Sequence, residues 1–163
     1  MERCLDCRGW IAMNKITVLG VPMDLGADRR GVDMGPSAIR YANLFSKLRK
    51  MGFQVKDAGN IHVQTPESYD PGNTQLKYLH EVVSVNHELA DEVARIRQGG
   101  GFPLLLGGDH SIAIGTIAGL ARTRQKMGVI WFDAHGDLNT VDTSPSGNIH
   151  GMSLAANIGL GSP

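Results

Sequence analysis

The chain has 163 residues, of which 42% are hydrophobic and 20% charged, values typical of one folded globular domain rather than a disordered or collagen-like chain. Its 16 Lys and Arg balance its 16 Asp and Glu, so no net charge attracts it to nucleic acid or to an acidic membrane. No apolar stretch approaches the roughly 18 residues of a membrane-spanning helix. We therefore expect local recognition of a partner, with no nucleic acid and no membrane.

The first twelve residues contain four charged side chains and lack the apolar core of a secretory signal. This composition predicts a cytoplasmic protein. We interpret residues 1–12 as a disordered or non-native leader, because Met13 precedes an apolar run and fits the start of the native chain. Cys4 and Cys7 form a C-x-x-C pair without a second pair or an adjoining strand and helix, so we interpret their thiols as incidental.

The first half of the chain predicts two strands and two helices. A nearly continuous apolar run at 15–21 is typical of a strand buried on both faces. Proline in a first turn, followed by apolar residues at helical spacing, predicts a helix over 35–51. A short strand follows at 54–56, and the longest amphipathic pattern predicts a helix from residue 76 to the glycines at 99–101.

The second half continues the alternation of strands and helices. We expect a buried strand at 102–106, a helix at 111–124 and another buried strand at 129–133. A loop rich in Gly, Ser and Thr follows at 136–151, and a last helix is predicted at 152–157. This order predicts an α/β fold, with a mostly parallel sheet and helices on both faces. In such sheets ligands bind at the carboxyl ends of the strands.

Polar residues follow two of these strands. Gly107-Gly108-Asp109-His110 comes after the strand at 102–106, and Asp133, His135 and Asp137 come after the next. A single His in such a place is more often a hydrogen-bonded structural residue. Residues at i, i+2 and i+4 point the same way in an extended chain, and their charge repulsion favours a bound cation over a solvated acidic loop. The sequence therefore predicts a metal site.

The types of ligand restrict the metal only in part. Carboxylate and imidazole without cysteine suit manganese, iron, cobalt, nickel or zinc, and exclude copper(I) and an iron–sulfur cluster. The small polar residues of 139–152 favour a rim that holds a substrate, although a plain surface loop is the ordinary reading of such a composition. His150 could move a proton, because its unperturbed pKa lies near 6.5.

These motifs resemble those of the ureohydrolase family. G-G-D-H-S at 107–111 looks like its first signature and D-A-H-G-D at 133–137 like its second. The strings D-L-N-T at 137–140 and S-G-N-I-H-G-M at 146–152 are more similar to arginases than to agmatinases. The segment at 21–40 also resembles bacterial arginases. The resemblance covers 13–163 and implies a three-layer, arginase-like parallel sheet, of which this chain contains the N-terminal part.

What the resemblance implies is the hydrolysis of L-arginine to L-ornithine and urea by hydroxide at two manganese ions, within arginine metabolism and the urea cycle. His110, Asp133 and Asp137 would hold the first ion, and Asp133 and His135 the second. Asn139, Ser146 and Asn148, with His135, would contact the substrate, and His150 would relay protons to the leaving amine. Asp109 matches the motif but has no chemical role that we can assign, so we expect it to be structural. The family habit implies a homo-oligomer, a trimer or a hexamer.

The family's third signature, D-x-D, does not occur among residues 138–163, and neither does a later Glu that would contact the guanidinium group. This chain thus offers the first metal three protein groups and the second only two. We interpret it as the N-terminal half of an arginase and expect the isolated 163 residues to be inactive, poor in metal and prone to aggregate. Two alternatives stay open: an agmatinase or other guanidino hydrolase, and a non-catalytic remnant or interaction subunit.

Overall fold

The structure is a computed structural model that describes residues 14–27, 29–123 and 126–161. The leader predicted at 1–12, including Cys4 and Cys7, lies outside the described residues.

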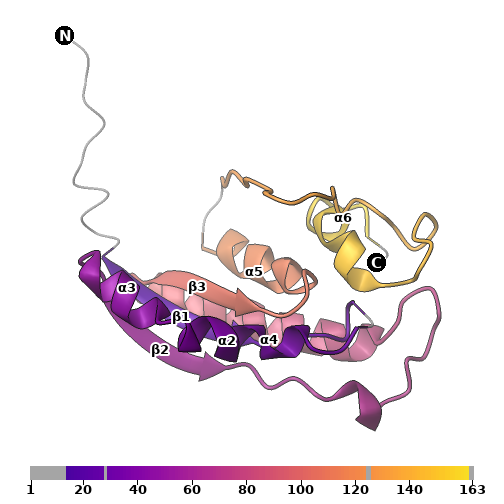
Figure 1. Ribbon diagram of the computed structural model, residues 1–163. Helices are drawn as coiled ribbons and strands as arrows, with labels where there is room; N and C mark the ends of the chain where they lie inside the picture. The colour runs from indigo at the N-terminus through magenta and orange to yellow at the C-terminus, as the bar shows by residue number, and fades with distance from the viewer. Residues whose placement is uncertain (1–13, 28, 124–125, 162–163) are drawn as a thin grey trace.

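Three parallel strands form the sheet, in the order β2-β1-β3 (Figure 1). The strands are β1 (Lys15–Val21), β2 (Gln54–Asn60) and β3 (Phe102–Gly107). The central strand β1 is buried along most of its length and contributes to hydrophobic clusters on both faces, as predicted. The strands predicted at 15–21 and 102–106 form, but β3 is less buried than predicted, since Phe102 is 41% exposed and only Pro103 and Leu106 are fully buried. Strand β2 continues four residues beyond the predicted end at residue 56.

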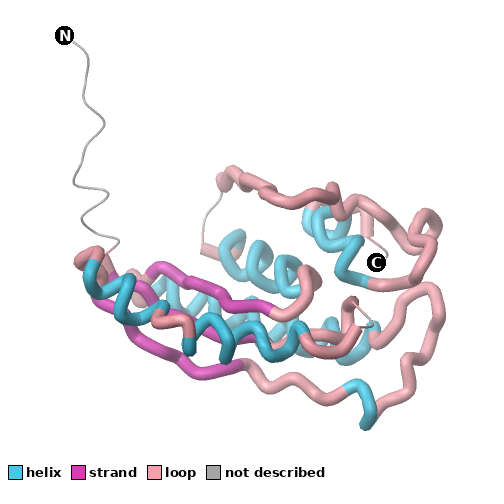
Figure 2. Tube along the Cα trace, viewed as in Figure 1, coloured by secondary structure: helices cyan, strands magenta, loops and turns pink. Residues whose placement is uncertain are grey.

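The helices and strands alternate along the chain, as Figure 2 shows. The α-helices are α2 (Gly35–Tyr41), α3 (Leu44–Lys50), α4 (Leu79–Gln98), α5 (Ile112–Ala121) and α6 (Ser153–Asn157), and the 3-10 turns are η1 (Val32–Met34), η2 (Pro66–Ser68) and η3 (Ile149–Met152). Within the described part of the chain, no helix combines the length and the apolar character needed to cross a membrane.

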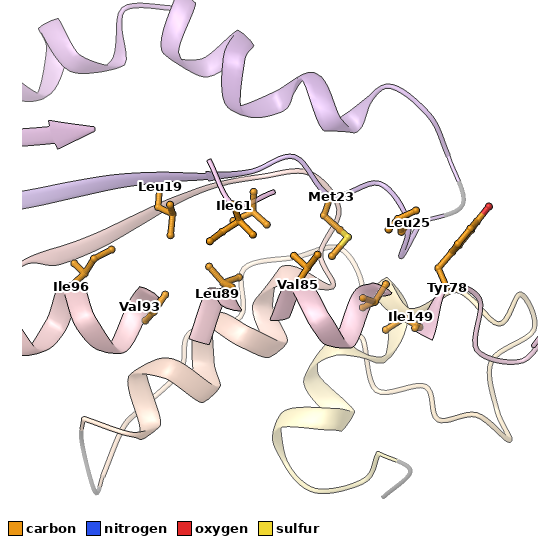
Figure 3. Close-up of a cluster of buried hydrophobic side chains, with 12 residues drawn as sticks. Leu19, Met23, Leu25, Ile61, Tyr78, Val85, Leu89, Val93, Ile96 and Ile149 are labelled. Carbon is orange, nitrogen blue, oxygen red and sulfur yellow. The ribbon is translucent and has the colours of Figure 1, made fainter. Parts of the chain in front are cut away.

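Two hydrophobic cores lie on opposite faces of the sheet. On one face, Ile16 and Val18 of β1 pack with Leu106 of β3 against α3. On the other face, Leu19 and Val21 pack against the buried side of α4, as the close-up in Figure 3 shows for Leu19. The expected α/β fold, a parallel sheet between layers of helices, is therefore confirmed. Helix α5 packs mainly against α4.

The helix predicted over 35–51 is in fact two helices. Asn43 has a left-handed backbone, with φ of 65°, and separates α2 from α3. Asn tolerates this conformation better than most residues, since its short polar side chain can bond to nearby backbone. The apolar spacing across 39–51 is compatible with either one helix or two, so it does not reveal the break.

The strand predicted at 129–133 does not form. Residues 127–132 have no regular secondary structure, and Ile130 and Phe132 are 94% and 100% exposed. The expectation of a buried strand was therefore wrong for this chain. A strand needs a hydrogen-bonded neighbour, and β1, β2 and β3 pair only with one another among the described residues. The helix predicted at 111–124 begins at Ile112 and ends at Ala121.

Candidate metal centre

The candidate site lies beyond the carboxyl end of β3. His110 comes three residues after the end of β3, and Asp133 and Asp137 come from the loop that runs from α5 to α6, orange in Figure 1. His110 Nδ1 lies 2.9 Å from Asp133 Oδ2 and 2.8 Å from Asp137 Oδ2. Ligand atoms of these three side chains all lie within 4.8 Å of one another. One imidazole nitrogen and two carboxylate oxygens thus converge on one point.

Backbone contacts hold Asp137 in place. Asp137 has a left-handed backbone, with φ of 49°. Its backbone carbonyl oxygen accepts hydrogen bonds from the N–H groups of Leu154 and Ala155 in the first turn of α6. The side chain is only 6% exposed. Its Oδ2 atom is buried and accepts no hydrogen bond, and the nearest charged group is the His110 ring, whose Nδ1 lies 2.8 Å away. A buried carboxylate oxygen without a partner is costly unless a cation binds it.

Asp133 is favoured as an anion. The backbone N–H of His135 donates to Asp133 Oδ1 at 2.8 Å, and this hydrogen bond is the main reason why the pKa of Asp133 lies below its ordinary value. The nearby rings of His110 and His135 lower that pKa further. At neutral pH the centre therefore presents carboxylate oxygen atoms ready to bind a cation.

The donor set fits a divalent metal. Carboxylate oxygen and neutral imidazole nitrogen suit manganese and the other first-row ions named above, and a buried Asp137 Oδ2 without a hydrogen-bond donor favours binding of a cation. The described residues bring together three side chains that could hold one ion.

His135 lies outside this group of three. Its side chain is 82% exposed, with Nδ1 3.2 Å from Asp133 Oδ1. The expectation of an extended segment at 133–137 was wrong, because the chain bends at 133–135 and is left-handed at Asp137. The alternation argument therefore does not explain why Asp133 and Asp137 converge. His110, from a separate loop, meets them because both loops reach the same end of the sheet.

Trp131 is a site residue that sequence reasoning missed. Its ring stacks on that of His110, with centroids 4.4 Å apart and an interplanar angle of 23°. The indole Nε1 is buried without a hydrogen-bond partner. A large aromatic two residues before Asp133 was the available signal, but it was read as part of the buried strand.

The four predicted residues of the following loop are spread along it. Asn139 N–H donates to Gly151 C=O at 3.2 Å and so closes the loop at its base. Asn148 N–H donates to Ser146 Oγ at 3.2 Å. The His150 carbonyl accepts a bond from Ser153 Oγ at 2.9 Å. Gly147, between Ser146 and Asn148, has φ of 70°, and a Cβ there would lie 1.9 Å from Thr74 O, so only glycine fits.

Asp109 is buried and fully bonded. Its Oδ2 accepts from the N–H groups of Gly26 and Ala27, and its Oδ1 accepts from the N–H and hydroxyl of Ser111. Burial raises the pKa of this carboxyl, while the bonds from Ser111 and Gly26 oppose the rise. The side chain does not belong to the metal-ligand group.

A parallel α/β sheet with carboxylates and imidazole gathered at its carboxyl edge is typical of domains that bind their ligands beyond the strand ends, and these side chains could hold a metal ion there. The chain belongs to the arginase family, which matches residues 14–162. It is similar to the arginase of Brevibacillus brevis, with 61% identity over 150 residues that make up 91% of this chain and 50% of that protein.

Solved structures of arginases are also similar to this chain. The native structure of arginase from Bacillus caldovelox matches with a TM-score of 0.88 and 53% identity, over 93% of this chain and 51% of that one. Entamoeba histolytica arginase in complex with L-ornithine matches with a TM-score of 0.81 and 39% identity, over 92% and 51%. The chain thus spans about half the length of the curated relatives it matches.

Proposed function

We propose that the complete product of this reading frame, meaning this chain with whatever the frame adds beyond residue 163, hydrolyses L-arginine to L-ornithine and urea. The observation that carries the proposal is the convergence of His110, Asp133 and Asp137, with a buried Asp137 oxygen left for a cation. Family membership and the arginase names of its relatives support the reaction. The L-ornithine bound to the Entamoeba histolytica enzyme supports the class of substrate.

The proposed metal is manganese, with two ions. His110, Asp133 and Asp137 would hold the first, and Asp133 and His135 would contribute to the second. Metal ions bound as a pair lower the pKa of water and so supply a nucleophile at neutral pH. The His135 side chain is 82% exposed and its Nδ1 lies 3.2 Å from Asp133 Oδ1, so the ring adjoins the residue proposed to be shared by both ions.

The loop at 139–150 would bind the amino-acid end of the substrate. Asn139, Ser146 and Asn148 carry amide and hydroxyl groups suited to an α-ammonium and an α-carboxylate, and His135 is a further proposed contact. His150 would hold a proton and pass it to the leaving amine, since imidazole takes up and releases protons near neutral pH.

The test is an assay of urea release from L-arginine by the complete product, with and without added manganese. Manganese-dependent release is the expected result. Turnover of agmatine in preference to L-arginine would instead identify an agmatinase. Absence of turnover of either compound by a folded, metal-loaded protein would overturn the proposal and favour a non-catalytic role.

The ligand assignment has a separate test. We expect Asp133→Ala and His135→Ala each to lose at least one tightly bound manganese ion per chain, measured by elemental analysis after dialysis. His80→Ala is a matched control, because the His80 side chain is 93% exposed and lies outside the candidate site. Unchanged metal content in Asp133→Ala or His135→Ala would refute the assignment of that residue.

The assembly and the location of the protein are further proposals. A homo-oligomer of three or six chains in the cytoplasm follows from the resemblance to bacterial arginases. The mass of the complete product in solution, measured by light scattering, tests the assembly. A stable monomer at micromolar concentration would contradict it.

A further inference from the structure

Asp109 connects the loop that carries His110 to a distant turn of the chain. Its Oδ2 accepts bonds from Gly26 N–H at 2.8 Å and from Ala27 N–H at 3.1 Å, which are 83 and 82 residues away in sequence. The residue is only 6% exposed. Gly26 packs so tightly that a Cβ there would lie 2.7 Å from Asp109 Oδ1. The carboxylate thus holds both N–H groups of the Gly26–Ala27 turn.

The carbonyl groups of the same two residues bind the proposed substrate loop. His150 N–H donates to Gly26 C=O at 3.1 Å, and Asn148 Nδ2 donates to Ala27 C=O at 3.0 Å across 121 residues of sequence. The N–H groups of the turn therefore donate to Asp109, and its carbonyl groups accept from Asn148 and His150. Movement of the turn would move both loop residues.

The hydrogen bond from Asn148 Nδ2 to Ala27 fixes the orientation of the Asn148 side-chain amide. Because Nδ2 donates to Ala27, the amide oxygen is directed elsewhere, and it is buried without a hydrogen-bond partner. Buried polar atoms are nearly always satisfied, so an unpartnered one calls for an explanation. A carbonyl oxygen in this position suits a donor brought by a ligand, such as an ammonium group.

We propose that Asp109 is a positioning residue, which acts through the Gly26–Ala27 turn to fix the acceptor oxygen of Asn148 and the backbone of His150 relative to the metal ligand His110. This inference rests on the proposed function for the identity of the substrate. The mechanical link itself depends only on the hydrogen bonds.

The variant that tests the link is Asp109→Asn in the complete product. An amide cannot accept on both sides, so either the Gly26–Ala27 donors or the Ser111 donors lose their partner. Asp70→Asn is a matched control, because exposed Asp70 accepts the N–H two residues ahead, as Asp109 does, but makes no long-range hydrogen bond within the described part of the chain. The control separates the long-range link from the local turn.

The first readout is hydrogen exchange of the backbone without substrate. In Asp109→Asn we expect at least about tenfold faster exchange at Gly26, Ala27 and His150, since a tenfold change corresponds to about 1.4 kcal/mol, the size of one hydrogen bond. Exchange in β1 and α4 should stay unchanged. Faster exchange at Gly26 and Ala27 without faster exchange at His150, or acceleration spread evenly over the fold, would overturn the proposal.

The second readout is kinetic. We expect the KM for L-arginine to rise about tenfold while kcat changes less than about threefold and manganese content is kept. Equal loss of kcat and metal would instead identify a merely structural role. If the parent protein releases no urea from L-arginine, the proposed function fails, and hydrogen exchange still decides whether Asp109 positions the loop.

A measurement on the unmutated protein covers the case in which Asp109→Asn does not fold. If the link holds, the amides of Gly26, Ala27 and His150 exchange through the same local opening. Their exchange then gives the same free energy of opening and the same change of that free energy with added urea. Opening of His150 at a separate, lower free energy would show that the turn does not hold the loop.

Discussion

At the scale of single residues, Ser153 connects the two loops of the site through the hydrogen bonds of its hydroxyl group. It is fully buried, and its Oγ lies 3.0 Å from the carbonyl oxygen of His110 and 2.9 Å from that of His150. One hydroxyl proton is shared between two acceptors, so the serine fixes the spacing of a proposed metal ligand and a proposed proton carrier.

We expect Ser153→Ala to lower the free energy of unfolding by about 1–2 kcal/mol, because both carbonyl groups lose a donor within a buried setting. Chemical denaturation measures the change. Ser68→Ala is the control, because Ser68 Oγ has one exposed contact, with Thr65 at 3.0 Å. Equal stability of the two variants would show that the Ser153 hydroxyl contributes nothing.

Arg40 and Asp57 form a second local link, between α2 and β2. Arg40 donates to both carboxylate oxygens of Asp57, at 3.0 and 2.9 Å. Burial alone would raise the pKa of Asp57, but the bonds from Arg40 and from Gly59 N–H outweigh it, so this pKa is lowered. The carboxylate therefore binds protons less readily in the folded chain than in the unfolded one.

A carboxyl with a lowered folded pKa adds stability above its unfolded pKa and loses it as the pH falls. We expect Asp57→Asn to be less stable than the parent at pH 6, and the difference to vanish as the pH falls below the ordinary value of 3.8. The difference should stay under about 1 kcal/mol, because the side chain is 40% exposed and water screens the pair. Thermal unfolding at several pH values tests this, and a gap that widens toward low pH would contradict it.

The sequence indicated the ligand types of the candidate site better than their geometry. Asp133 and Asp137 stood out because two carboxylates follow one strand, and His110 because it follows another. The alternation rule failed because Asp137 adopts a left-handed backbone, which sequence spacing does not report. Trp131 was missed because its stacking on His110 depends on how two loops meet.

At the scale of elements, helices α4 and α5 approach closely because α5 has glycines where they touch. A Cβ at Gly115 would lie 2.4 Å from Asn86 O, and one at Gly119 would lie 2.5 Å from Ala90 O. Asn86 reinforces the contact, since its Oδ1 accepts from Gly115 N–H at 2.7 Å and its Nδ2 donates to Val82 C=O. The packed helices α4 and α5 thus hold the loop with His110, which lies just before the start of α5.

We expect Gly119→Ala to destabilise the fold by about 1–3 kcal/mol, because the new methyl group would collide with the backbone of α4. Helix propensity alone would favour alanine by nearly 1 kcal/mol, so the sign of the change decides which effect dominates. Gly128→Ala is the control, since a Cβ there meets nothing within 4 Å. A stabilised Gly119→Ala variant would show that the helices separate at little cost.

Local sequence patterns predicted most elements, because the spacing of apolar residues within an element is enough to indicate a strand or a helix. The apolar run of β1 and the long amphipathic pattern of α4 each identify one structure. Elements that depend on a partner were less predictable: the apolar segment at 129–132 has strand-forming residues but no paired neighbour among the described strands. The break at Asn43 was missed for another reason, since a single left-handed residue leaves the apolar spacing almost unchanged.

At the scale of the whole molecule, the described residues cover both faces of the sheet but not all of its apolar surface. Helix α3 covers one face and α4 the other. The outer edge of β3 has no paired strand among the described residues. The segment from Val129 to Phe132 is also largely exposed, with Ile130 at 94% and Phe132 at 100%. Contiguous exposed apolar residues with strand propensity favour association between chains.

We therefore expect the 163-residue chain to associate as its concentration rises, and the double variant Ile130→Lys/Phe132→Lys to reduce that association. Light scattering across a concentration series measures the effect. The matched control is Tyr41→Lys/Met51→Lys, which adds the same charge at residues that are 91% and 70% exposed but do not adjoin one another. Because both variants gain two positive charges, general repulsion would act on them equally. An equal reduction in both would assign the association to net charge, whereas a reduction confined to the first assigns it to the exposed segment.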